Sequence, residues 1–141
     1  MVIVPGGLAV GANGIHVCGN TLFYASLDQG LFASIPISLA DGTPPGPVDI
    51  IVNSTLLGAD DFTLPRDGTK AWVAGNGNNV IKEIGMFNKT STLTANSALL
   101  SSTSSVALGR TCSDWDNLYI SGASNIHGSP NARVSKATGL Q

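Results

Sequence analysis

The stretch FTLPRDGTKAWVAG, residues 62–75, decides the fold because it reads as a strand, a tight turn and a second strand. Its centre, Asp67-Gly68, favours a chain reversal, since Gly adopts left-handed dihedral angles without strain and Asp bonds its own backbone. The same pattern recurs in GIHVCGNTLFYAS, residues 14–26, and in VALGRTCSDWDNLYISG, residues 106–122. The turns of these copies are Gly19-Asn20 and Asp116-Asn117. The sequence therefore contains three strand–turn–strand units.

The spacing of the units indicates the architecture. Their second strands begin at Leu22, Ala71 and Leu118, which lie 49 and 47 residues apart. A period of roughly 40 to 50 residues with strands and no helical pattern is typical of β-propeller blades. We expect an all-β fold with about three blades, which is half of a six-bladed propeller. The chain, residues 1–141, then forms one partial domain with blades at approximately 8–55, 56–104 and 105–141, and a final strand around Ala132–Val134.

The composition supports short strands joined by many turns. The chain has 17 Gly and 7 Pro among its 141 residues, and only 11% of its residues are charged. The formal net charge is −2, and the basic residues are scattered, so we expect neither nucleic acid nor an anionic membrane as a partner. No apolar run is long enough to cross a bilayer, and no Cys/His spacing of a zinc site occurs.

Two cysteines and two glycosylation sequons bear on the cellular location. For Cys18 and Cys112 we expect free buried thiols rather than a disulfide, which requires Cα atoms within roughly 7 Å. The sequons begin at Asn53 and Asn88 and predict glycans in a secreted parent protein, although sequons also arise by chance. The N-terminal MVIVPGGLAV lacks the basic and long apolar regions of a signal peptide. The location therefore stays open.

Together these motifs resemble the family of senescence marker protein, gluconolactonase and luciferin-regenerating enzyme. NGIHVCGNTLFYAS (13–26) is similar to the family's Asn-Gly strand entry. ADDFTLPRDGTKAWVA (59–74) is similar to its Pro-Asp-Gly and Trp-Val-Ala strands, and VALGRTCSDWDNLYISGAS (106–124) to its Phe-Gly-Gly blade. The resemblance covers nearly all of this chain but only the C-terminal half of the family fold. It implies a six-bladed propeller with a divalent ion at its axis.

The resemblance also implies metal ligands. Asn13 matches the family's axial Asn ligand, and Asp60 matches the Asp that binds metal and acts as a base. Amide and carboxylate oxygens are the hard ligands that Ca²⁺ accepts. The other family ligands belong to blades that this sequence does not contain. We therefore expect Ca²⁺ or another divalent ion only at an incomplete site.

Three residues are candidates for catalysis. Asp60 precedes a strand, where it is either a base near the axis or a turn carboxylate. His16 lies in an alternating strand and is either a general base in the axial channel or a surface histidine. Arg110 either polarises a substrate oxygen or is an exposed turn residue. Strand alternation predicts that Asp61 points away from Asp60, and His127 is expected in a solvated loop.

Two classes of function fit these residues. The ADDF form of the second unit is similar to fungal members of the family, which implies secondary-metabolite biosynthesis by hetero-Diels-Alder cyclisation. We favour this cyclase over a calcium-dependent lactonase because cyclisation needs mainly positioning and one or two donors, whereas hydrolysis needs an ion or base and an activated water. The other class is a non-catalytic half-propeller or truncated remnant. The expected partners are a small hydrophobic or lactone substrate and a second copy that completes the ring.

Overall fold

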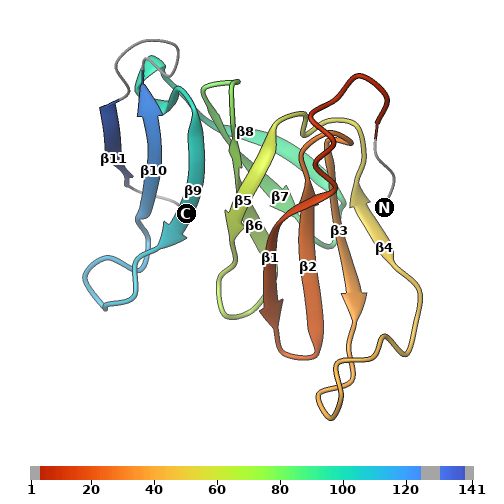
Figure 1. The fold of residues 1–141 in the computed structure, drawn as a ribbon. Helices are drawn as coiled ribbons and strands as arrows, with labels where there is room; N and C mark the ends of the chain where they lie inside the picture. The colour runs from red at the N-terminus through yellow and green to blue at the C-terminus, as the bar shows by residue number, and fades with distance from the viewer. Residues whose placement is uncertain (1–3, 125–130, 139–141) are drawn as a thin grey trace.

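The computed structural model describes residues 4–124 and 131–138, which form an almost entirely β structure (Figure 1). Three antiparallel sheets follow one another along the chain, and the second packs between the first and the third. The all-β prediction is therefore confirmed. Within the described residues, no helix has the length and apolarity that a membrane span requires. His127 lies outside the described residues.

The strands of each sheet are consecutive in sequence and pair in that order. The first sheet contains β1 (Ala12–Cys18), β2 (Thr21–Ser26), β3 (Leu31–Pro36) and β4 (Asp49–Val52). The second contains β5 (Ala59–Thr63), β6 (Lys70–Gly75), β7 (Val80–Gly85) and β8 (Thr90–Asn96). A short 3-10 helix, η1 (Ala98–Leu100), leads to the third sheet of β9 (Thr103–Leu108), β10 (Leu118–Ser124) and β11 (Asn131–Ala137). The third sheet starts slightly ahead of residue 105, where we expected its blade to begin.

In the first two units the turns form where the repeated pattern predicts them. Gly19 and Asn20 join β1 to β2, and Gly19 has a φ of 59°. In the second unit Gly68 has a φ of 63°, and the Asp67 carboxylate accepts hydrogen bonds from the backbone N–H (3.1 Å) and hydroxyl (2.9 Å) of Thr69. A glycine in the left-handed region stabilises a chain reversal when the Asp beside it accepts hydrogen bonds from the residue two positions further along the chain. These turns connect the first two strands of the first two units. In the third unit the expected tight turn at Asp116-Asn117 is replaced by a longer loop, residues 109–117, between β9 and β10.

Hydrogen bonding in these turns makes the fold sensitive to acid. The backbone and side chain of Thr69 hold the pKa of Asp67 below its ordinary value of 3.8, and Thr111 does the same for the pKa of Asp114. Because these pKa values are lowered in the folded state, the carboxylates contribute stability above the ordinary pKa, and this contribution is lost as the pH falls through the lowered pKa. We expect Asp67→Asn, which keeps an acceptor but does not titrate, to weaken the fall of Tm below about pH 4. Thermal melts by circular dichroism between neutral and acid pH would measure it, and an acid limb identical to that of the unaltered chain would contradict this assignment.

Two hydrophobic clusters hold the sheets together, and β6 contributes to both. Alternation along β6 directs Ala71 and Val73 into the cluster shared with the first sheet, and Trp72 and Ala74 into the cluster shared with the third sheet. At the centre of the first cluster, the ring of Phe32 lies edge-on to that of Phe62, with centroids 4.8 Å apart. The central sheet is therefore buried on both faces, as in stacked blades.

Truncation of Phe32 tests this packing. The Phe32 side chain is fully buried, so Phe32→Ala removes a large apolar surface and leaves a cavity between the first two sheets. We expect the free energy of unfolding to fall by about 3–5 kcal/mol. Urea denaturation followed by circular dichroism would measure the change. Phe87→Ala is the matched control, because Phe87 is 88% exposed and its removal should leave the urea midpoint almost unchanged.

Candidate functional site

The first strand of each sheet carries a β-bulge at an equivalent place. In β1 the pairing with β2 shifts between Ala12 and Ile15, and in β5 the pairing with β6 shifts between Ala59 and Phe62. In β9 the shift lies beside Ser104, between the pairs Ser121↔Ser105 and Gly122↔Thr103. A bulge inserts one extra residue and re-aims the side chains around it. The bulged pairs are Asn13-Gly14, Asp60-Asp61 and Ser104-Ser105.

The first cluster of polar side chains surrounds Asp60. Asn13 Nδ2 donates to Asp60 Oδ1 (2.5 Å), and Asn76 Nδ2 donates to Asp60 Oδ2 (2.8 Å). The Ser102 hydroxyl, directly before β9, donates to Asn76 Oδ1 (3.5 Å). The sequence-predicted residues Asn13 and Asp60 therefore meet, and the cluster links all three sheets. Both oxygens of Asp60 are occupied by amide donors.

The second cluster surrounds Asp61. His16 Nε2 lies 2.9 Å from Asp61 Oδ1, and the Ser105 hydroxyl donates to Asp61 Oδ2 (2.7 Å). The His16 ring also lies edge-on to Phe62, with centroids 4.6 Å apart. Simple alternation predicts that Asp61 points away from Asp60. A bulge in β5 interrupts the alternation at this place, and Asp61 contacts side chains of both flanking strands, β1 and β9. The side chains of His16 and Asp61 are 42% and 29% exposed, so solvent and small molecules reach the pair.

Gly14 makes room for Asp61. A Cβ atom at position 14 would lie 2.8 Å from Asp61 Oδ1 and 2.9 Å from the Asp60 carbonyl oxygen and from Asp61 Cα. Contacts this close with backbone atoms require one of the strands to move. The absence of a side chain at Gly14 therefore lets β1 and β5 approach closely enough for His16 to reach Asp61.

The second cluster opens into a hollow, a cavity of about 1260 Å³ bounded by the three sheets and their loops. His16, Asp61 and Ser105 are among its lining residues, and Arg110 contributes to the lining from the loop between β9 and β10. Asn13 and Asp60 do not belong to the lining. The structure thus brings His16 and Arg110 to one cavity and separates Asp60 from them.

Further along the hollow, the lining combines cationic and apolar groups. Arg66 lies in the loop between β5 and β6, and Trp115, which is 66% exposed, lies in the loop between β9 and β10. Cys18 and Cys112 also line the hollow, and both are free thiols. The expectation of free thiols is met, but that of burial is not, because Cys18 is half-buried and Cys112 is exposed in a loop.

The donor set of the first cluster does not make a calcium site from this chain alone. Ca²⁺ takes six to eight oxygen ligands in total, typically with several carboxylates. The cluster supplies one carboxylate, Asp60, together with the amides of Asn13 and Asn76 and the Ser102 hydroxyl. Across residues 4–124 and 131–138, no group of three or more His, Cys, Asp or Glu side chains is placed to hold a metal ion. The metal expected from the resemblance therefore requires ligands from outside this cluster.

Sequence reasoning missed Asp61 and Ser105, although the repeat contains a signal for them. Asp61 and Ser105 each directly precede a buried apolar residue, Phe62 and Val106, which is paired regularly with the next strand. Gly14 holds the same place before Ile15. When the three sequence units are aligned on these apolar residues, the three bulged pairs occupy equivalent positions.

Comparison with solved structures identifies the three sheets as propeller blades. A luciferin-regenerating enzyme matches with a TM-score of 0.69 and 18% identity, over 92% of this chain and 45% of that chain. A chain of the nidogen–laminin complex matches with a TM-score of 0.65 and 13% identity, over 90% of this chain and 44% of that chain. Regucalcin from Agrobacterium tumefaciens, a calcium-binding protein, matches with a TM-score of 0.61 and 16% identity, over 80% of this chain and 38% of that chain. The likeness confirms the prediction of about three propeller blades.

These matches show the fold alone, because their sequence identities are low. The chain spans less than half of the length of each of the three structures. No protein-family model matches the chain, and no curated protein matches it. The three structures with this fold are an enzyme, a protein of an intermolecular complex and a calcium-binding protein, so the fold does not specify a function.

Substitution of Gly14 tests the geometry of the second cluster. We expect Gly14→Ala to push β1 away from β5, to weaken the His16–Asp61 hydrogen bond and to lower the free energy of unfolding by about 1–3 kcal/mol. Urea denaturation and the ¹H–¹⁵N spectrum of the His16 imidazole would report the two effects. Ser104→Ala is the matched control at the exposed bulge position of β9. An unperturbed imidazole spectrum in Gly14→Ala would show that the close approach is not required.

Proposed function

We propose that the hollow is the active site of a hydrolase that opens small lactones or related esters. The observation that carries the proposal is the cluster of His16, Asp61 and Ser105 on the wall of the hollow that Arg110 also lines. An imidazole paired with a carboxylate is an established arrangement for general acid–base catalysis. The propeller fold shared with a luciferin-regenerating enzyme is compatible with this activity but does not specify it.

His16 acts as the general base. An ionised carboxylate only accepts hydrogen bonds, so in this mechanism we assign the proton of the neutral His16 imidazole to Nε2, which lies 2.9 Å from Asp61 Oδ1. Nδ1 is then the acceptor that takes a proton from a water molecule. Ser105 donates to the second oxygen of Asp61 and fixes the orientation of the carboxylate. Because the Ser105 hydroxyl donates to Asp61 and not to His16, we assign it no nucleophilic role.

The proposed reaction proceeds by attack of water on the lactone carbonyl. As the oxygen of water bonds to the carbonyl carbon, its proton passes to His16 Nδ1, and the carbonyl oxygen becomes an oxyanion. The Arg110 guanidinium, which keeps its charge and has five donors, stabilises this oxyanion. When the ring C–O bond breaks, the leaving oxygen takes the proton from His16. The product is a hydroxy acid, and the enzyme returns to its starting state.

The structure changes the preference that the sequence suggested between hydrolysis and cyclisation. Cyclisation needs positioning and a donor, and it makes no use of a base such as the His16–Asp61 pair. Asp60, our sequence-based candidate for the base, has both oxygens bonded to amides and therefore suits a positioning role. We accordingly favour hydrolysis. Fungal origin and a place in secondary-metabolite biosynthesis find no support in these residues, and glycosylation of Asn53 and Asn88 stays a prediction.

Paired substitutions at the two adjacent carboxylates test the proposal. We expect the purified chain to hydrolyse members of a panel of γ- and δ-lactones and aryl esters, with Asp61→Asn lowering kcat/KM by about 10²–10⁴-fold. Asp60→Asn removes the same charge from the neighbouring position, and Asp67→Asn removes it from a remote turn. A smaller effect of Asp60→Asn than of Asp61→Asn would assign the base function to the second cluster.

Two results would contradict the proposal. One is the absence of turnover across the panel by a folded chain, which would favour the non-catalytic half-propeller. The other is a larger loss of activity in Asp60→Asn than in Asp61→Asn. The mass of the same preparation by light scattering should be measured in parallel, because it tests the homodimer expected from the sequence and defines the assembly assayed.

A further inference from the structure

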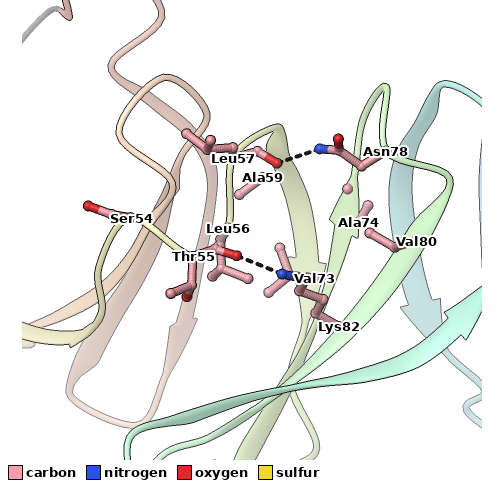
Figure 2. A pocket seen from close by; sticks show the side chains of 11 residues that line it. Ser54, Thr55, Leu56, Leu57, Ala59, Val73, Ala74, Asn78, Val80 and Lys82 are labelled. Atoms are coloured by element: carbon pink, nitrogen blue, oxygen red, sulfur yellow. Dashed lines mark hydrogen bonds between the residues drawn. The ribbon is translucent and has the colours of Figure 1, made fainter.

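A second cavity, of about 290 Å³, lies between the linker 53–58 and the second sheet and shares no lining residue with the hollow. One side is formed by the linker 53–58, which connects β4 to β5. The other side is formed by β6, β7 and the turn that joins them (Figure 2). Its volume is at the lower end of the range of ligand pockets, so it suits a small molecule. The proposed hydrolysis uses no residue of this cavity.

The linker is held in place from both sheets, so the cavity is preformed. The Lys82 ammonium on β7 donates to the Thr55 carbonyl oxygen (2.6 Å), and Asn78 Nδ2 donates to the Leu57 carbonyl oxygen (2.6 Å), as Figure 2 shows. From the first sheet, the Gly30 carbonyl oxygen accepts the Leu56 N–H (3.1 Å). A pocket whose walls are already fixed loses less conformational entropy when a ligand enters.

The walls of this cavity are mainly apolar, and one cation lies at its edge. Leu56, Val73 and Val80 are among the aliphatic side chains that line it, and Lys82 also belongs to the lining. The ammonium of Lys82 has three donors, of which the Thr55 carbonyl takes one. Two lysines form ion pairs, Lys70 with Glu83 and Lys89 with Asp49. Within residues 4–124 and 131–138, Lys82 forms no ion pair. The cation is therefore available to an anionic ligand.

We propose that this cavity is a binding site for a small aliphatic carboxylate. The carboxylate accepts hydrogen bonds from the Lys82 ammonium, and the aliphatic chain packs against Leu56, Val73 and Val80. A carboxylate is favoured over a neutral acceptor because a hydrogen bond between two charged groups is stronger than one to a neutral group. An aliphatic chain is favoured over a polar one because the walls offer few polar partners.

Hexanoate is a suitable probe, with hexanamide as its neutral analogue. We expect saturable binding of hexanoate in isothermal titration calorimetry, with the backbone amide signals of Leu56, Val73 and Val80 shifting in ¹H–¹⁵N spectra. Hexanamide should bind more weakly. Lys82→Gln should weaken hexanoate binding by about ten- to a hundredfold and leave hexanamide binding unchanged.

The variants are chosen so that folding and binding are separated. The glutamine of Lys82→Gln removes the charge and retains an N–H donor, although its side chain is one bond shorter. Unchanged hexanamide binding in this variant verifies that the linker and the cavity are retained. Lys136→Gln removes a charge from the exposed β11 and should leave hexanoate binding unaltered. Thermal melts of each variant verify the fold. Absence of saturable hexanoate binding, shifts confined to other residues of the unaltered chain, or equal affinity in Lys82→Gln would overturn the proposal.

Discussion

The structure depends on the burial of the second sheet on both faces. Along β6, consecutive side chains enter different hydrophobic clusters, and β7 also contributes to both, so these two strands hold the first and third sheets in place. The stabilising free energy of hydrophobic burial is roughly proportional to the apolar area removed from water, and a sheet that is covered on both faces buries such area on each of them. This packing sets β1, β5 and β9 close enough for their side chains to meet. The two clusters of polar side chains can form because the hydrophobic clusters fix the distances between β1, β5 and β9.

The adjacent carboxylates of Asp60 and Asp61 differ in their chemistry because their hydrogen-bond partners differ. Asp60 accepts hydrogen bonds from two amides, which bind a carboxylate without exchanging protons with it. Asp61 instead contacts a hydroxyl and an imidazole, and an imidazole nitrogen can donate or accept a proton. One extra residue in β5 separates these environments. A regular strand would have directed one of the two carboxylates to the opposite face of its sheet.

Much of the fold could be predicted from the sequence, because strand–turn–strand units with Gly, Asn and Asp at the reversals leave few alternatives. The resemblance implied that Asn13 and Asp60 are both metal ligands, but the sequence alone could not show that they converge, because β1 and β5 are brought together by packing between sheets. Asp61 and Ser105 were missed because alternation was assumed to continue through the strand, and a bulge depends on pairing with a neighbour that lies far away in sequence. Exposure of Cys112 was missed for a related reason: the length of the loop between β9 and β10 breaks the equivalence of the three turns.

The recurrence of the bulge in β1, β5 and β9 has an evolutionary consequence. Each blade presents two residues at the same place, and these positions lie apart from most of the residues that form the hydrophobic clusters. Mutation at 13–14, 60–61 or 104–105 can therefore diversify the chemistry of this surface while the blade packing is retained, with Gly14 as the sterically constrained exception. A combinatorial library restricted to the remaining five positions would sample new specificities on an inherited scaffold. Such separation of variable from structural positions is a property that favours divergence after duplication of a blade.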